Sequence, residues 1–255
     1  MPVSAQPQRS RKSEFDQHGF LVVREFYGPQ ELATLHTELD RYIRDVVPTL
    51  SGTHAFFHDR TRPETLKQLQ HMGLDPFFEQ SRQQPAWLAL AEELLGEPCT
   101  AQEPEWFNKP PGTDHATPPH QDNYYFCLQP AHVVTLWLAL DPVDEENGCL
   151  RYVRGSHRGG IRDHCLTNIL GFSQGIADYG APDRNHEVAV RLAPGDLVAH
   201  HGETIHRAEP NRSAAQQRRA FAMVFRGCSV QRDATRYARY QAALKAQHNA
   251  IGLET

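Results

Sequence analysis

The sequence predicts a mainly β protein with flanking helices, built around a barrel or jelly roll. Two observations predict this fold class. From about residue 99 the chain consists of short β-branched and aromatic runs separated by Pro and Gly, which favours an antiparallel barrel over a parallel sheet. Before that point, leucines recur at three- and four-residue steps with charges between them, which is typical of amphipathic helices.

The helices are expected mainly in the first hundred residues. Residues 13–27 are interpreted as a short helix or turn that leads into a strand at Phe20–Val23. A helix is expected over 29–48, because a proline stands at each end. A second is expected over 85–95, where Gly96 closes it.

The strands are expected in the second half of the chain, over residues 132–140, 187–192, 197–200 and 219–226. Residues 158–186 are rich in glycine and too long for a turn, so we expect a functional insert, often a lid. The polar segment 231–248 is expected to be helical.

This pattern predicts one domain over residues 13–230, with a helical part to about 98 and a barrel from about 99. Residues 1–12 are expected to form a disordered arm, and residues 231–255 a C-terminal helix and tail.

Composition excludes several functional classes. The net charge of −5 argues against nucleic-acid binding, which needs a basic excess. No apolar stretch is long enough for a membrane span, and the polar start lacks the apolar core of a secretory signal. The five cysteines show no Cys-x-x-Cys spacing, so we expect free thiols in the cytoplasm.

The composition is compatible with an enzyme that acts on a small-molecule substrate. A dimer is compatible with the sequence, which does not determine the oligomeric state.

His120-Gln121-Asp122 and the distant His206 predict an iron site. Two imidazoles and one carboxylate occupy one face of an octahedral iron and leave the opposite face open. On a strand, residues 120 and 122 point the same way, and His206 must come from another strand. The chain has 15 histidines, so a surface or core histidine is the ordinary alternative. His200 and His201 are interpreted as core groups or as contacts of the metal ligands.

An iron with open positions suits a 2-oxo acid co-substrate, whose far carboxylate needs a fixed cation. Arginine is favoured because its fork pairs both oxygens. Arg218 shares a strand face with the small Ala220 and Ala222, as a pocket requires, whereas Arg219 shares its face with bulky apolar residues. We therefore prefer Arg218 and keep Arg219 as an alternative, together with a pair of solvated arginines.

The chain resembles the phytanoyl-CoA dioxygenase (PhyH) family of Fe(II)/2-oxoglutarate oxygenases over roughly residues 13–227. The resemblance rests on an ordered set of motifs: Phe15 to Phe26, Asn108-Lys109-Pro110-Pro111-Gly112, His120-Gln121-Asp122, Leu136 to Leu140, Asn147 to Leu150, Gly155-Ser156-His157, Pro194-Gly195-Asp196, and His206 with Asn211.

The resemblance implies a double-stranded β-helix, which is a cupin-like jelly-roll barrel. It implies Fe(II) bound by His120, Asp122 and His206, and 2-oxoglutarate held by Arg218, Trp137 and Lys67. Lys109 is the other lysine for this last role. Two features depart from the family pattern: Ala208 replaces a serine that often helps to hold the co-substrate, and the gap from His206 to Arg218 is one residue longer than expected.

The resemblance further implies a dioxygenase that uses O2 to hydroxylate a C–H bond, with release of succinate and CO2. The presence of Asp122 favours hydroxylation over halogenation, which needs that position open for chloride. The substrate is expected to be small and polar or anionic, with Tyr124 to Phe126, Arg162 and Arg184 near it. An acyl-CoA hydroxylase is the alternative within the family. A cupin-type metal isomerase or lyase, or a non-catalytic iron or 2-oxoglutarate sensor, is the alternative outside it.

Overall fold

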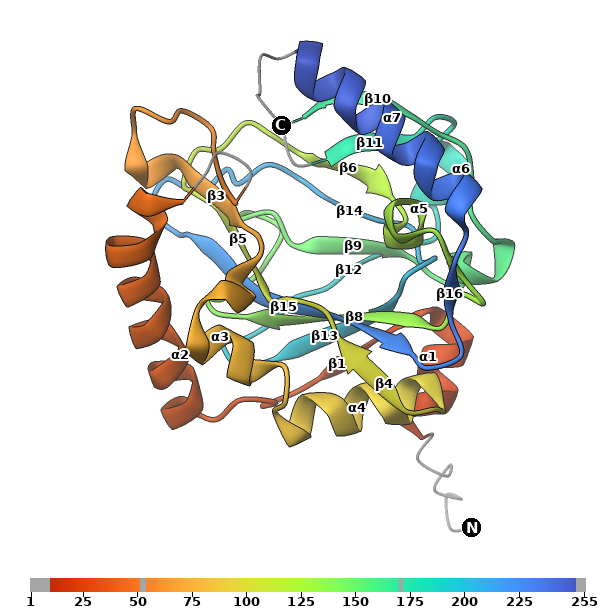
Figure 1. The fold of residues 1–255 in the computed structure, drawn as a ribbon, viewed down its shortest axis with the longest axis horizontal. Helices are drawn as coiled ribbons and strands as arrows, with labels where there is room; N and C mark the ends of the chain where they lie inside the picture. Colours follow the sequence, from red (N-terminus) through yellow and green to blue (C-terminus); the bar gives the residue numbers. More distant parts are fainter. Residues whose placement is uncertain (1–9, 51–53, 170–171, 251–255) are drawn as a thin grey trace, which may run out of the picture.

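Two antiparallel β-sheets make up the centre of the computed structural model (Figure 1), which describes residues 10–50, 54–169 and 172–250. The large sheet has eight strands: β1 (Phe20–Val23), β13 (Leu197–His201), β8 (Val133–Ala139), β15 (Arg218–Gly227), β5 (Glu105–Lys109), β3 (Leu66–Leu69), β2 (Ala55–Phe57), and β4 (Cys99–Ala101), which pairs with β15 off this path. The small sheet has the order β12 (Glu187–Ala189), β9 (Leu150–Val153), β14 (His206–Ala208) and β6 (Thr117–His120). The predicted jelly-roll class is confirmed.

Apolar side chains fill the space between the two sheets. Strand β8 is buried along its whole length, because its alternate residues serve two different cores. Trp137 and Ala139 pack in one cluster with Tyr152 and Ala208 of the small sheet, whereas Leu138 belongs to a second cluster on the outer face of the large sheet. On the face of β8 that looks into the space between the sheets, the large Trp137 is therefore followed by the small Ala139.

Helices cover the outer face of the large sheet (Figure 1). They contribute Leu35, Phe78 and Trp87 to the outer cluster. There the Trp87 ring lies edge-on to the Phe221 ring of β15, with the two ring centroids 5.9 Å apart. The helices of the chain are α1 (Arg11–His18), α2 (Pro29–Arg41), α3 (Pro76–Ser81), α4 (Pro85–Leu95), α5 (Asp122–Phe126), α6 (Ala181–Arg184) and α7 (Ala234–Ala250), with short 3-10 or π turns at Tyr42–Val46, Val47–Thr49, Pro63–Thr65, Met72–Leu74 and Ser156–Gly159. None in the described part is long and apolar enough to cross a membrane.

The helices expected from periodicity are present, with changed ends. The one predicted over 29–48 is α-helical only to Arg41 and continues as a π turn and a 3-10 turn. Helix α4 ends at Gly96, whose φ of 76° lies in the left-handed region, as predicted.

Two predicted boundaries of the domain plan are wrong. The sheet does not begin at about residue 99, because the strand predicted at Phe20–Val23 is β1, which pairs with the distant β13, and β2 and β3 also precede residue 99. Strands β2 and β3 have only three and four residues, which are too few to reveal a period. The C-terminal segment likewise opens with a strand, β16 (Gln231–Arg232), which pairs with β7 (Leu128–Gln129) before α7.

The predicted arm and insert differ in a similar way. Within the arm expected over 1–12, Arg11 and Lys12 belong to α1, because the Ser10 hydroxyl caps the helix by accepting from the Ser13 N–H; residues 1–9 lie outside the described residues. The insert 158–186 forms a hairpin, β10 (His164–Ile169) with β11 (Phe172–Ile176), followed by α6. Residues 170–171 and 251–255, which belong to the predicted insert and tail, also lie outside the described residues.

The two-sided burial of β8 gives a stability prediction. Leu138→Ala removes a fully buried side chain, and we expect it to lower the free energy of unfolding by about 2–5 kcal/mol. Leu166→Ala is the matched control, because that leucine is 61% exposed and its loss should change the stability by less than about 0.5 kcal/mol. Urea unfolding of both variants is the measurement, and similar losses would contradict the assignment of β8 to the centre.

Candidate metal centre

His120 and Asp122 stand at the junction between a strand and a helix. Strand β6 ends at His120, and Asp122 is the first residue of α5, so the expectation that both lie on one strand is wrong. The intervening Gln121 keeps extended backbone angles, φ −128° and ψ 122°, and the strand-like alternation therefore persists for one more residue. The buried Gln121 amide donates to the carbonyls of Gly160 and Glu203, which ties the junction to the rest of the barrel.

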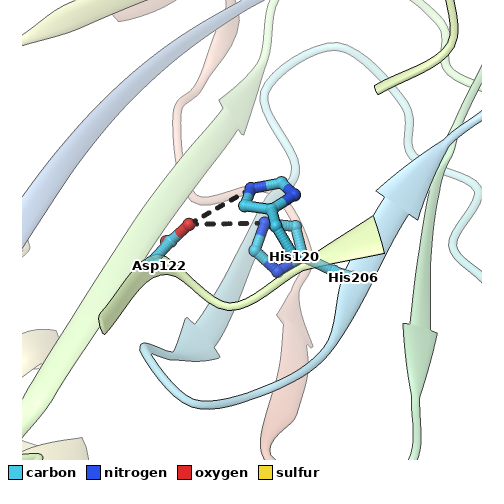
Figure 2. A group of neighbouring side chains, drawn as sticks. All are labelled: His120, Asp122 and His206. Atoms are coloured by element: carbon cyan, nitrogen blue, oxygen red, sulfur yellow. Dashed lines mark ion pairs between the residues drawn. The ribbon is translucent and has the colours of Figure 1, made fainter. Parts of the chain in front are cut away.

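His206 reaches this junction through strand pairing. It is the first residue of β14, and the antiparallel register sets it directly opposite His120. The two imidazole centroids are 4.1 Å apart, and their Nε2 atoms lie 3.4 Å (His120) and 3.6 Å (His206) from Asp122 Oδ1. Figure 2 shows both rings turned toward the carboxylate. One ligand atom from each of the three residues lies within 4.8 Å of the others, so the structure brings together the predicted ligands.

Hydrogen bonds orient both imidazoles for metal binding. His120 Nδ1 donates to the Pro118 carbonyl at 2.8 Å, and His206 Nδ1 donates to the Thr204 carbonyl at 3.0 Å. A carbonyl only accepts, so each Nδ1 carries the hydrogen and each Nε2 keeps its lone pair. Burial, together with the nearby His120, holds the pKa of His206 well below its usual range, which favours the neutral form that a metal requires.

One carboxylate oxygen of Asp122 accepts hydrogen bonds from neighbouring side chains, and the other faces the two imidazoles. Its Oδ2 accepts from Thr135 Oγ1 at 2.6 Å and from His200 Nε2 at 3.0 Å. Because His200 Nε2 carries that hydrogen, its Nδ1 accepts from the Tyr152 hydroxyl at 3.0 Å. Burial alone would raise the pKa of Asp122, but His206, His120 and His200 outweigh it and hold the pKa well below the usual value. Asp122 is therefore ionised, with Oδ1 facing the two imidazoles.

The three side chains line a pocket of about 840 Å³, including its open mouth, between the two sheets. This volume is in the range of small-molecule sites. Trp137 and Arg218 form its inner wall, with the guanidinium carbon 5.4 Å from the Trp137 ring centroid. Arg218 is 4% exposed and has no carboxylate partner among the described residues, and its Nε has no hydrogen-bond partner. Burial lowers the pKa of Arg218 to about 10, so it remains a cation.

Arg219 points to the other face of β15. Its guanidinium pairs with Asp141, through Nε at 2.9 Å and Nη2 at 2.7 Å, outside the pocket. The two arginines that the sequence left in competition therefore have different surroundings: Arg218 lies in the pocket, and the charge of Arg219 is already compensated.

Both candidate lysines line the same pocket. Lys109 is 6% exposed, and its Nζ donates to the His115 carbonyl at 2.8 Å. Burial, and next the charge of Arg218, hold its pKa well below the usual value. Burial lowers the pKa of Lys67 to about 8, and the charge of Lys67 acts on the nearby His58.

Several residues of the site went unrecognised in the sequence, and the five residues expected near the substrate are not in the pocket lining: Tyr124, Tyr125, Phe126, Arg162 and Arg184. Thr135, Tyr152 and His58 had no motif to mark them. Arg162 and Arg184 do not line the pocket: Arg162 pairs with Asp178 and Asp183, and Arg184 lies over the Tyr179 ring. None of the described residues of the insert, 158–169 and 172–186, lines the pocket, because its hairpin packs beside β6 on another side of the barrel (Figure 1).

Comparison with known proteins places this geometry among iron enzymes. A model of the family "Phytanoyl-CoA dioxygenase (PhyH)" matches residues 15–220. Peroxisomal phytanoyl-CoA dioxygenase of Bos taurus is 27% identical over 214 residues, which cover 78% of this chain and 63% of the bovine protein. Phytanoyl-CoA dioxygenase of Arabidopsis thaliana is 24% identical over 244 residues, covering 82% and 85%. The chain thus spans less than two thirds of the bovine relative.

Solved structures share the fold. EvdO2 from Micromonospora carbonacea var. aurantiaca, complexed with 2-oxoglutarate, superposes with a TM-score of 0.71 at 24% identity, over 92% of this chain and 96% of that one. The epimerase SnoN, in complex with Fe3+, alpha-ketoglutarate and nogalamycin RO, superposes with a TM-score of 0.70 at 21% identity, over 90% and 87%.

The hydrogen bond between His200 and Asp122 gives a prediction for metal binding. His200→Phe removes the donor to Oδ2, so the carboxylate becomes free to rotate, and we expect the affinity for Fe(II) or Co(II) to fall about 10- to 100-fold. Titration against a competing chelator measures this. His186→Phe, at an exposed position, is the control. An unchanged affinity in His200→Phe would show that Thr135 alone positions the ligand.

Proposed function

The chain belongs to the phytanoyl-CoA dioxygenase (PhyH) family of Fe(II)- and 2-oxoglutarate-dependent oxygenases, and from that premise we propose that it hydroxylates a C–H bond of a small polar or anionic substrate. Succinate and CO2 are the products of the co-substrate. One observation carries the proposal: a buried Arg218, without a carboxylate partner in the described structure, lines the same pocket as His120, Asp122 and His206.

The candidate ligands fit an iron ion by their chemistry. Two imidazoles and one carboxylate are the donor set of the non-haem oxygenases, and one donor atom from each lies within 4.8 Å of the others. The ligands come from one end of β6 and the facing β14, so they occupy one side of the site and leave the pocket side open. When bound there, iron and 2-oxoglutarate supply the activation of O2. The residues around them orient the ligands and enclose the reaction.

The inner wall of the pocket fits the co-substrate. Arg218 offers a planar fork to a carboxylate in a buried position, where a charge-assisted pair is strong. Trp137 stacks under the guanidinium and limits its rotation. Ala220 and Ala222 on the same face of β15 keep that wall open, and the buried Ala208 offers no hydroxyl to the co-substrate. The sequence resemblance assigns Lys67 to the co-substrate as well, and Lys109 competes for this role because it lies against Arg218.

The substrate is proposed to be a small metabolite. The curated relatives are named for phytanoyl-CoA, and an acyl-CoA hydroxylase is therefore the alternative. The pocket favours the smaller, anionic molecule, because its volume of about 840 Å³ suits a small ligand and its lining carries the basic side chains of Lys67, Lys109 and Arg218. The cytoplasmic location expected from the free cysteines stays a prediction.

Co-substrate binding is the first test. Anaerobic addition of Fe(II) and then 2-oxoglutarate should produce the weak visible charge-transfer band of a chelated 2-oxo acid. Arg218→Ala leaves the far carboxylate without its partner, so we expect about 30-fold weaker binding of 2-oxoglutarate or more. Arg219→Ala is the matched control and should change the affinity little. Iron binding without any band would favour the cupin-type isomerase or lyase instead.

Asp122 provides the second test. Asp122→Ala removes the only carboxylate that faces the two imidazoles in the described structure, so we expect loss of iron binding and of succinate release. Asp40→Ala, at an exposed position, is the control. Succinate is measured after aerobic incubation with 2-oxoglutarate and a panel of small acids, and undiminished release in Asp122→Ala would refute its role as a ligand.

A further inference from the structure

Strand β5 places an acidic side chain, Glu105, on the face of the large sheet that forms the pocket wall. In the antiparallel register, Glu105 stands opposite Ala222 of β15, and Phe107 stands opposite Ala220. Alternate residues of a strand share a face, and Phe107 lines the pocket. Glu105 therefore lies on the pocket side of β5, next to the lining, and part of its surface is exposed.

Amide groups of the neighbouring strand β3 hold this carboxylate. The Gln68 Nε2 donates to Glu105 Oε2 at 3.2 Å, and the Gln70 side chain also hydrogen-bonds to Glu105. The register pairs Gln68 with Phe107, and Gln68 is 5% exposed and lines the pocket. The Glu105 carboxylate and the Gln68 amide thus form one polar patch that adjoins the pocket wall.

The charge of Glu105 has no cationic partner in the described part of the chain. No lysine, arginine or histidine there lies within ion-pair distance of it, and the nearest such influence, His71, pairs with Glu103 at 2.6 Å. Burial raises the pKa of Glu105 to about 7, and the charge of Asp122 raises it further. An ionised carboxylate in the interior costs free energy unless a cation pairs with it, and the amides that hold Glu105 carry no charge. A ligand that brings a cation would supply the missing partner.

Glu105 lies toward the candidate iron site and away from the proposed co-substrate anchor. Ala222 of β15 stands between Glu105 on β5 and Trp137 on β8, so only a small side chain separates them on this face. The influence of Asp122 on the pKa of Glu105 shows that these two carboxylates are neighbours. Arg218 shares the face of Ala222 four residues earlier on β15, a distance of roughly 13 Å along the strand. A group bound at Glu105 would therefore lie near the iron ligands and leave Arg218 to the co-substrate.

We propose that Glu105, held by Gln68, is a substrate subsite for an ammonium group, and that the substrate is a small amino acid. The ammonium group pairs with the Glu105 carboxylate, and the anionic end faces the basic lining of the pocket. A hydroxyl group would satisfy the same hydrogen bond but would leave the charge of Glu105 uncompensated. This assignment rests on the proposed function and narrows its small polar or anionic substrate to one that also carries an amino group.

The test measures binding of ω-amino acids to the loaded but inactive protein. Zn(II) replaces iron, and saturating N-oxalylglycine, an analogue of 2-oxoglutarate, occupies the co-substrate position. Each amino acid from glycine to 5-aminopentanoate is titrated by saturation-transfer NMR at pH 8, where Glu105 is ionised because its pKa is about 7. The hydroxy acid of the same length is titrated in parallel. We expect at least one amino acid to bind about tenfold more tightly than its hydroxy acid, because only the ammonium group makes a charge-assisted pair.

Substitution assigns the preference to one carboxylate. Glu105→Gln keeps the size of the side chain and removes its charge, so the preference for the amino acid should fall to about twofold or less while N-oxalylglycine binding is retained. Glu103→Gln, at a nearby carboxylate that is 38% exposed, is the matched control and should leave the preference unchanged.

Three outcomes separate the subsite from the proposed function. If the wild type with N-oxalylglycine bound shows no preference for any amino acid, the inference is overturned and the proposed function stands. This comparison needs no variant, so it decides the inference even if Glu105→Gln does not fold. An unchanged preference in Glu105→Gln would also overturn it, because the ammonium group would then bind elsewhere. Failure of the wild type to bind N-oxalylglycine at all would instead count against the proposed function.

Discussion

The pairing of β14 with β6 is the constraint on which the rest of the site depends. Its register sets His206 opposite His120, and this one antiparallel contact joins two parts of the chain that are far apart in sequence. The extended backbone of Gln121 then carries Asp122 round to the same side. A slip of one residue would turn His206 to the opposite face. The buried Gln121 amide, tied to Gly160 and Glu203, holds the strand end in place.

Burial gives the pocket its electrostatic character. Inside the barrel, burial lowers the pKa of His206 and keeps this imidazole neutral, whereas the nearby His206, His120 and His200 hold the pKa of Asp122 well below its usual value and keep it ionised. Arg218 keeps its charge, and no carboxylate among the described residues pairs with it. Burying a cation without a partner costs folding free energy. The position of Arg218 beside the candidate iron ligands is explained if an anionic ligand binds to it there.

The glycine-rich insert does not contribute to the pocket wall in the described residues. The lining includes Lys67 and Gln68 of β3 and residues 115–117, whereas the insert packs beside β6 and its Arg162 pairs with two aspartates. Helix α7 contacts α5, where Tyr240 packs on Tyr125 at 5.6 Å. The pocket lining therefore includes His58, Lys67 and Gln68 from the part of the chain that the sequence pattern marked only as helical and mixed.

The sequence by itself determined the fold class, the long helices and the strands that are buried on both faces. A hydrophobic period marks the helices and an unbroken apolar run marks those strands, and both are local properties of the chain. Alternation along β15 also separated the faces of Arg218 and Arg219 before any contact was known. The tertiary structure decided what depends on pairing between distant segments: the short strands β2 and β3, the contact of His200 with Asp122, and the convergence of Lys67, Lys109 and Arg218 on one pocket. These residues carry no periodic signal, since each is a single side chain whose neighbours are fixed by sheet register and not by its own place in the sequence.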